Sequence, residues 1–476
     1  MPSQDHAELH FADIASLSRQ LREGTLSPVV LTQAFLDRIE AMDASLRSYA
    51  TVLADEALEQ ARQAEEELIR GQWRGPLHGV PLGLKDLFFK KGAPTTGGMW
   101  IYRDFRPAYD ATVVTRLREA GAVILGKLRL TEGAWTRDHP EFPTPLNPWD
   151  ASRWVGASSS GPAVATASGL CTASLGSDTG GSIRFPCAMT RLTGIKPTWG
   201  RVSVYGAFGL APSMDHVGPM TRSAEDAGHV LQAIAGPDPN DPMALVGPVP
   251  EFVVPEPNVE GLRIGLDEEL AVSSVDPEVA GVIEAVAATM ESAGAEICSV
   301  RLPPLGPVCD GFGSFCGAEA AVVHESTFPS RRDEYGPFLR DFLDRGRTVT
   351  GMEMARFERD RRALSGALAA LFEHVDLLLV PVLVTTGREL TPEIDIAPEE
   401  VGSFTRFTTP FNASGNPTIT MPGGCAADGT SIAFQFVAPT LAERRLVTAG
   451  RVFQSASDWH LAHPSGVGPN TEAPAT

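Results

Sequence analysis

The N-terminal part of the chain has apolar residues at helical spacing. Ser27 and Pro28 form a typical helix start, with a capping hydroxyl followed by proline in the first turn, and apolar residues recur at helical spacing over 30–39. A second, more charged helical segment covers 54–70 and ends beside Gly71. The pattern predicts helices in the first part of the chain.

From about residue 75, short apolar runs alternate with helical patterns and with loops rich in Gly and Ser. GVPLGL (79–84) and AVILG (122–126) have the length and composition of strands, as do VDLLLVPVLV (375–384) and IAFQFVAP (432–439) near the end. Such alternation is typical of βα units around a buried sheet. We expect an α/β fold, with a twisted mixed β-sheet flanked by helices.

One large domain is expected over residues 1–476. The Pro-rich stretch at 235–260 indicates a surface excursion, not a linker. The candidate chemistry lies in the first half of the chain, whereas predicted strands continue to its end. The expected parts are N-terminal helices (1–74), a catalytic core (75–235), a helical and excursion region (236–372), closing strands and a helix (373–462), and a tail (463–476).

The composition restricts the class of partner. Lys and Arg total 39 against 59 for Asp and Glu, which gives a net charge of −20, and this disfavours nucleic acid and anionic membrane surfaces. The N-terminus is polar, and no apolar run is long enough to span a bilayer, so we expect a cytoplasmic protein. The six cysteines lack zinc-site spacing. We expect reduced cysteines, no metal, no cofactor, and a monomer or homodimer that acts on a small molecule.

Three short segments contain residues suited to acyl transfer. GVPLGLKDLF places Lys85 at the end of an apolar strand, GASSSG precedes a helical stretch, and GSDTGGSIRFP places two glycines before Ser182. A serine hydroxyl is a weak nucleophile and needs a base. A buried lysine can be that base, because burial lowers the pKa of its amine. Each segment is weak support alone, and their combination at this spacing is what indicates a hydrolase.

The loop before Ser182 also has the composition of an oxyanion hole. Gly180 and Gly181 lack a Cβ, so the backbone can turn tightly and approach a substrate closely. With Thr179 and Ser182 they offer backbone N–H groups for a developing oxyanion.

These segments closely resemble the signature of the amidase-signature family. The matches are GVPLGLKD, GASSSG and GSDTGGSIRFP, followed by GIKPTWGRVS (194–203), SMDHVGPM (213–220) and the closing stretch 404–424. The resemblance covers nearly the whole chain. It implies that Ser182 is the nucleophile, Lys85 the general base and acid, and Ser158 the relay between them. It also implies that Asp178 and Arg184 support the loop.

Two details of the serine run stay open at this point. The residues alone do not favour Ser158 over Ser159 or Ser160, and the assignment rests on the resemblance, which also implies a cis peptide bond before Ser158. Ala157 stands where the family usually has glycine, and Pro162 where it usually has a small polar residue.

The resemblance implies hydrolysis of linear amides through an acyl-enzyme. Aromatic residues in TTGGMWIYRDF (95–105), with Trp135 and Trp154, favour neutral bulky or aryl substrates, and carbamates (urethanes) and esters are plausible extensions. Ordinary core packing is an equally good explanation of these aromatics. The main alternative is an amidotransferase subunit that acts on misacylated tRNA within a complex. Those subunits usually carry an F-x-MGSSTE-like segment, and this chain has TEGAWTRDHPEFPTPLNP (131–148) there.

Overall fold

A computed structural model gives the structure of the chain and describes residues 9–387 and 404–464. Most of the predicted tail, from residue 465 onward, lies outside the described residues.

The described residues form one eleven-stranded sheet. Its strands are β1 (Tyr49–Val52), β2 (Pro81–Lys85), β3 (Val123–Leu128), β4 (Ala173–Asp178), β5 (Thr193–Lys196), β6 (His216–Thr221), β7 (Arg263–Leu266), β8 (Glu296–Ser299), β9 (Leu377–Pro381), β10 (Thr418–Cys425) and β11 (Ser431–Val437). Their order across the sheet is β1-β3-β2-β4-β6-β5-β10-β11-β9-β7-β8. β2 lies between β3 and β4, parallel to both, whereas β6, β5, β10 and β11 pair with their neighbours in antiparallel fashion. The sheet is therefore mixed, as expected.

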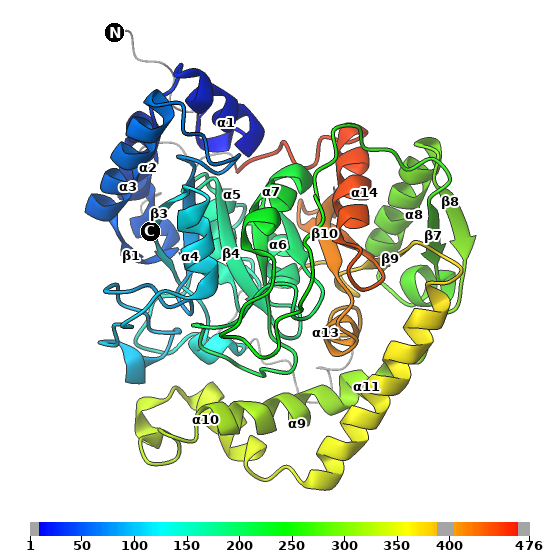
Figure 1. Cartoon of the computed structure of the whole chain (residues 1–476). Coiled ribbons are helices and arrows are strands. Elements are labelled where there is room, and N and C mark those ends of the chain that lie inside the picture. The colour runs from blue at the N-terminus through cyan, green and yellow to red at the C-terminus, as the bar shows by residue number, and fades with distance from the viewer. Residues whose placement is uncertain (1–8, 388–403, 465–476) are drawn as a thin grey trace.

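Helices cover both faces of this sheet (Figure 1). They are α1 (Ile14–Glu23), α2 (Pro28–Leu46), α3 (Ala54–Ile69), α4 (Thr112–Glu119), α5 (Ser160–Ala167), α6 (Arg184–Thr190), α7 (Ala224–Ile234), α8 (Pro277–Ser292), α9 (Gly306–Val323), α10 (Pro337–Gly346), α11 (Gly351–Leu371), α13 (Thr409–Ala413) and α14 (Glu443–Ser455). The predicted helices over 28–39 and 54–70 are confirmed as α2 and α3. Ser27 caps α2 by accepting the N–H groups of Val29 and Val30 at 3.1 and 3.2 Å.

Alternate residues on the central strands face different helical layers. Ile419 of β10 lies beside Gly450 of α14. The next residue of β10, Thr420, pairs with Gly194 of β5, and Gly194 lies against Cys187 of α6 on the other face. With a helix on each face, every residue of β2, β3, β4, β5, β6 and β9 is buried. This explains why these strands appear in the sequence as short, nearly continuous runs of apolar or small residues.

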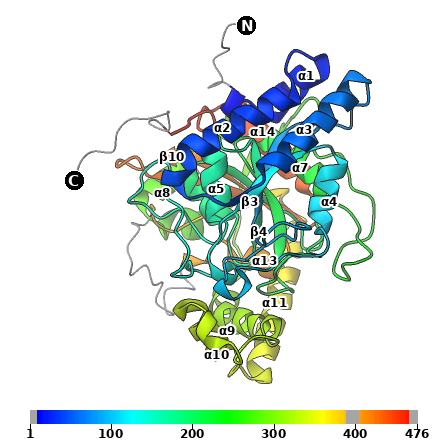
Figure 2. The ribbon, with the colours of Figure 1, turned by 90° about the vertical axis from the view of Figure 1, so that its left-hand side faces the viewer.

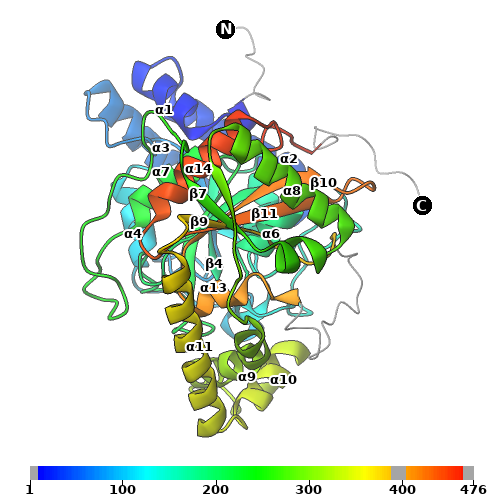
Figure 3. The same cartoon turned by 90° about the vertical axis from the view of Figure 1, so that its right-hand side faces the viewer.

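The helices α9, α10 and α11 form an arm at the end of the molecule opposite to α1 (Figures 1, 2 and 3). α9 and α10 cross where Gly317 and Gly346 meet, and a Cβ on Gly346 would collide with the carbonyl of Gly317. A capping box starts α11, because Thr350 Oγ1 accepts from Glu353 N at 3.2 Å and the Glu353 carboxylate accepts from Thr350 N at 2.8 Å. The arm lies within the helical and excursion region expected at 236–372, which also contains β7, α8 and β8.

None of the helices in 9–387 and 404–464 has the length and apolarity needed to cross a membrane. Within the same residues, no group of three or more His, Cys, Asp or Glu side chains is arranged to hold a metal ion.

Candidate active site

Lys85 is the last residue of β2 and its side chain is fully buried. Its Nζ donates hydrogen bonds to three serine hydroxyls: Ser158 at 2.7 Å, Ser159 at 2.9 Å and Ser177 at 2.8 Å. The next residue, Asp86, forms an ion pair with Lys127 at 2.9 Å. The lysine amine therefore sits among neutral hydroxyls, although a carboxylate follows it in the sequence.

This environment sets the protonation of Lys85. Burial lowers the pKa of its amine to about 7, and the charges of Asp178 and Asp215 partly oppose the shift. Near neutral pH, a large fraction of the amine is unprotonated and able to accept a proton.

Hydrogen bonding distinguishes the three serines of the GASSSG run. Ser159 Oγ donates to the carbonyl of Ser177 at 3.2 Å and accepts from Ser177 N at 3.3 Å, so its proton already has an acceptor. Ser160 Oγ is buried and has no partner among the described residues. Ser158 Oγ contacts Lys85, and the Ala157–Ser158 peptide bond is cis, as the resemblance implied. These hydrogen bonds favour Ser158 over Ser159 and Ser160 as the residue that could pass a proton between Ser182 and Lys85.

Ser182 lies on the loop between β4 and α6, next to the serine run. The N–H of Ser159 donates to the carbonyl of Ser182 at 3.2 Å, which brings the two segments into contact. Ser182 is partly exposed and lines a large cavity. The structure thus brings Lys85, Ser158 and Ser182 into one region, and no local sequence pattern could have placed them together.

The Asp178 carboxylate organises this loop. It accepts from the N–H groups of Gly181 at 2.9 Å and Ile183 at 3.0 Å. The N–H of Gly181 therefore already has an acceptor. Among the described residues, the N–H groups of Thr179, Gly180 and Ser182 have no hydrogen-bond acceptor, and they are the better candidates for an oxyanion hole.

Asp178 is itself paired with Arg184, and both side chains are fully buried. Arg184 Nη2 lies 2.9 Å from Asp178 Oδ1, and Asn412 Nδ2 donates to the same oxygen at 2.8 Å. Burial alone raises the pKa of Asp178, but the Arg184 charge and these hydrogen bonds hold it below its ordinary value. The predicted loop-supporting role of both residues agrees with these contacts.

Removing Arg184 should strongly destabilise the protein. In Arg184→Leu the charge of Asp178 stays buried without its partner, and such a loss typically costs about 3–5 kcal/mol. We expect urea denaturation to report a fall of that size in the free energy of unfolding. The exposed Arg347→Leu is the matched control and should change it by less than about 0.5 kcal/mol. Equal effects in the two variants would contradict the assigned support role.

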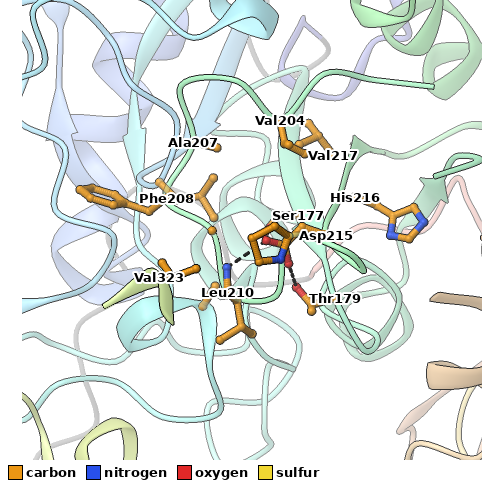
Figure 4. Close-up of a pocket in the computed structure, with 14 residues that line it drawn as sticks. Ser177, Thr179, Val204, Ala207, Phe208, Leu210, Asp215, His216, Val217 and Val323 are labelled. Atoms are coloured by element: carbon orange, nitrogen blue, oxygen red, sulfur yellow. Dashed lines mark hydrogen bonds between the residues drawn. The ribbon is translucent and has the colours of Figure 1, made fainter. Parts of the chain in front are cut away.

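A small cavity of about 170 Å³ lies on the side of Thr179 and Ser177 (Figure 4). Thr179 Oγ1 donates to Asp215 Oδ1 at 2.5 Å, and Leu210 N donates to the other oxygen at 2.9 Å. Burial raises the pKa of Asp215. The segment SMDHVGPM matches the family signature, but nothing in its local sequence indicated this contact between Asp215 and the start of the loop that carries Ser182.

The cavity that Ser182 lines has a volume of about 810 Å³. Its aromatic lining residues come from the core and from the arm: Trp135, Trp154, Phe185, Phe312, Phe338, Phe342 and Phe404. Trp135 stacks on Phe342 of α10 with ring centroids 3.7 Å apart, and Phe185 packs against Phe404 at 4.7 Å. Charged lining residues such as Asp310, Asp341 and Glu353 are exposed. Arg137 also lines the cavity, but it is half-buried and its guanidinium lies 5.1 Å from the ring centroid of Phe338. The pocket therefore combines aromatic walls with exposed charges and one half-buried arginine.

The expectation for aromatic pocket residues is confirmed in part. Trp135 and Trp154 line the cavity, whereas residues 95–105 do not. Instead, Trp100 packs against His139 and Phe142, and Tyr102 packs against Phe105 and Phe208. For this segment, ordinary packing was the right explanation.

Comparison with known proteins agrees with this geometry. The family model described as Amidase matches residues 30–447, and the chain belongs to this amidase-signature family of amide hydrolases. The chain is 43% identical to "Putative amidase AmiD" of Mycobacterium tuberculosis, over 97% of this chain and 98% of that protein. It is 35% identical to a glutamyl-tRNA(Gln) amidotransferase subunit of a Geobacter species, over 95% and 99%. A solved bacterial aryl acylamidase of the same family superposes with a TM-score of 0.85 at 25% identity, covering 95% of this chain and 98% of that one.

Proposed function

We propose that the chain hydrolyses neutral bulky or aryl amides through an acyl-enzyme on Ser182, with Lys85 as base and Ser158 as proton relay. The observation that carries the proposal is the 2.7 Å contact between Lys85 Nζ and Ser158 Oγ, next to a loop whose Ser182 opens onto an aromatic pocket. The proposal involves no metal and no cofactor.

In the proposed acylation step, neutral Lys85 takes the proton of Ser158 as Ser158 takes that of Ser182. The Ser182 oxygen bonds to the substrate carbonyl carbon, and the carbonyl oxygen becomes an oxyanion. The proton then returns from Lys85 through Ser158 to the leaving nitrogen, and the C–N bond breaks. In the deacylation step, water gives its proton to the same relay and its oxygen to the acyl carbon, which releases the acid and the Ser182 hydroxyl.

The oxyanion is best stabilised by backbone N–H groups that have no competing acceptor. Those of Thr179, Gly180 and Ser182 fit this requirement, whereas that of Gly181 is shared with Asp178. Gly180 packs against Phe312, since a Cβ there would lie 2.6 Å from the ring. The loop and the pocket wall are therefore in direct contact, and a side chain at position 180 would not fit between them.

The aromatic interior of the pocket supports the choice of substrate. Aryl groups gain from burial and from ring–ring contacts with such walls. An aryl acylamidase among the similar structures supports the same choice. Carbamates and esters present the same carbonyl to Ser182 and are proposed as secondary substrates.

A substrate panel tests this preference. We expect kcat/KM for neutral aryl amides to exceed that for charged aliphatic amides by at least about 100-fold, because an unpaired charge is costly in an aromatic pocket. Aryl carbamates and aryl esters with the same aryl group are the matched comparison. A higher kcat/KM for charged aliphatic amides would overturn the substrate assignment but would leave the proposed catalytic residues unaffected.

A second candidate is an amidotransferase subunit, because a 35% identical relative has that name. That function requires partner proteins, whereas the proposed amidase should act as a cytoplasmic monomer or homodimer, without nucleic acid or membrane. Size-exclusion chromatography and copurification from the native host distinguish the two. Activity on aryl amides in a preparation free of other proteins supports the amidase.

A further inference from the structure

Resting on the proposed acyl-enzyme, we propose that Thr408 is a positioning residue that holds the Gly180–Gly181 peptide in the orientation needed for the oxyanion hole. Thr408 immediately precedes α13 and lies 228 residues from Gly180 along the chain. Its side chain is fully buried.

The Gly180–Gly181 peptide is held from both sides. Thr408 Oγ1 donates to the carbonyl of Gly180 at 2.7 Å, and on the other side of the same peptide the N–H of Gly181 donates to Asp178 at 2.9 Å. The Thr408 hydroxyl has one proton, and its other acceptor, the carbonyl of Thr405, is more distant at 3.3 Å. Because a peptide unit is planar, fixing both of its polar groups fixes its orientation.

This loop needs such a restraint because of its glycines. Gly181 has a φ of +135°, and glycine passes between positive and negative φ at little steric cost. The N–H groups of Gly180 and Ser182 belong to the two peptides that flank the restrained one. If the restrained peptide rotates, these groups rotate away from the position of the oxyanion.

Thr408 is held firmly enough to act as the restraint. Arg184 Nη1 donates to the carbonyl of Thr408 at 2.8 Å, and the N–H of Thr408 donates to the carbonyl of Thr405 at 2.9 Å. Thr405 and Phe404 line the substrate pocket. One short turn therefore connects the pocket wall to the nucleophile loop.

The adjacent residue provides a matched control. Thr409 is also fully buried, but its Oγ1 has no hydrogen-bond partner among the described residues. Thr408→Val and Thr409→Val remove the same hydroxyl from neighbouring positions. Only the first substitution removes a contact to the loop.

The test measures kcat and KM for the best aryl amide of the panel, together with the melting temperature. We expect Thr408→Val to lower kcat by about 10- to 100-fold, less than the loss of an oxyanion donor itself, with KM within about threefold of wild type. Thr408→Ser, which keeps the hydroxyl, should restore kcat to within about threefold, and Thr409→Val should match wild type. A Thr408→Val enzyme with unchanged kcat, or an equal loss in Thr409→Val, overturns the inference.

Covalent labelling separates this inference from the proposed function. Phenylmethylsulfonyl fluoride should modify Ser182, and peptide mass spectrometry locates the adduct. If the adduct forms elsewhere and Ser182→Ala retains turnover, the proposed function fails. If the adduct is on Ser182 and Thr408→Val keeps its kcat, only the role of Thr408 fails.

Discussion

Ser182→Ala should abolish hydrolysis while leaving the fold intact. The variant loses the atom that bonds to the acyl carbon, and removal of a serine nucleophile typically lowers kcat by on the order of 10⁶-fold. Ser182 is partly exposed and its side chain has no hydrogen-bond partner among the described residues, so the free energy of unfolding should hardly change. The measurement is kcat on the best aryl amide, with circular dichroism and melting temperature as tests of the fold.

Ser160→Ala is the control for this variant. Ser160 is buried in the same serine run, and its hydroxyl has no partner among the described residues. We expect its kcat to remain within about threefold of wild type, because it has no role in the proposed relay. Turnover by Ser182→Ala at the wild-type rate would sink the proposed mechanism.

Lys85→Met should remove both the activity and its pH dependence near neutrality. The wild-type pKa of about 7 predicts that kcat/KM falls about tenfold per pH unit below 7 and levels off above it, because only the unprotonated amine accepts a proton. Lys85→Met should lose several orders of magnitude in kcat/KM, and its remaining kcat/KM should not fall below pH 7 in this way. If kcat/KM of Lys85→Met still falls below pH 7 as it does in wild type, another group is the base.

The lowered pKa of Lys85 should also make the free energy of unfolding depend on pH. Its pKa is about 7 in the folded state and about 10.4 in the unfolded chain, so between these values the unfolded state binds more protons. The free energy of unfolding of wild type should therefore rise from about pH 7 to pH 10 relative to Lys85→Met. Identical pH dependence in the two proteins would contradict the lowered pKa. This measurement needs no substrate, so it is independent of the proposed reaction.

Much of the fold could be predicted from the sequence. The cap at Ser27 and the apolar runs at 79–84 and 122–126 correspond to α2, β2 and β3, because capping and strand burial are local consequences of residue type. The order of the strands could not be predicted. β5 pairs with β10 although more than 200 residues separate them, and no local pattern encodes that pairing.

The residues of the active-site region also include some that the sequence could indicate and some that it could not. Motif spacing indicated Lys85 and Ser182, the resemblance to the family implied Ser158, and the apolar strand before Lys85 indicated its burial. Ser177 lies in the same motif as Ser182, but its contact with Lys85 depends on β4 lying beside β2, and no local pattern encodes that pairing. Thr408 had no local signal, because its role depends on a hydrogen bond to a residue in a distant part of the chain.

The sequence by itself determined the family and the α/β class and indicated Lys85 and Ser182, because these depend on residue type at short range and on motif spacing. Only the tertiary structure distinguishes the three serines of GASSSG as candidates for the proposed proton relay. The three hydroxyls are equivalent in the sequence and differ in the partners that the fold gives them. The tertiary structure also decided that Asp86 pairs with Lys127 and leaves Lys85 among hydroxyls, since a side chain's electrostatic surroundings come from packing between strands.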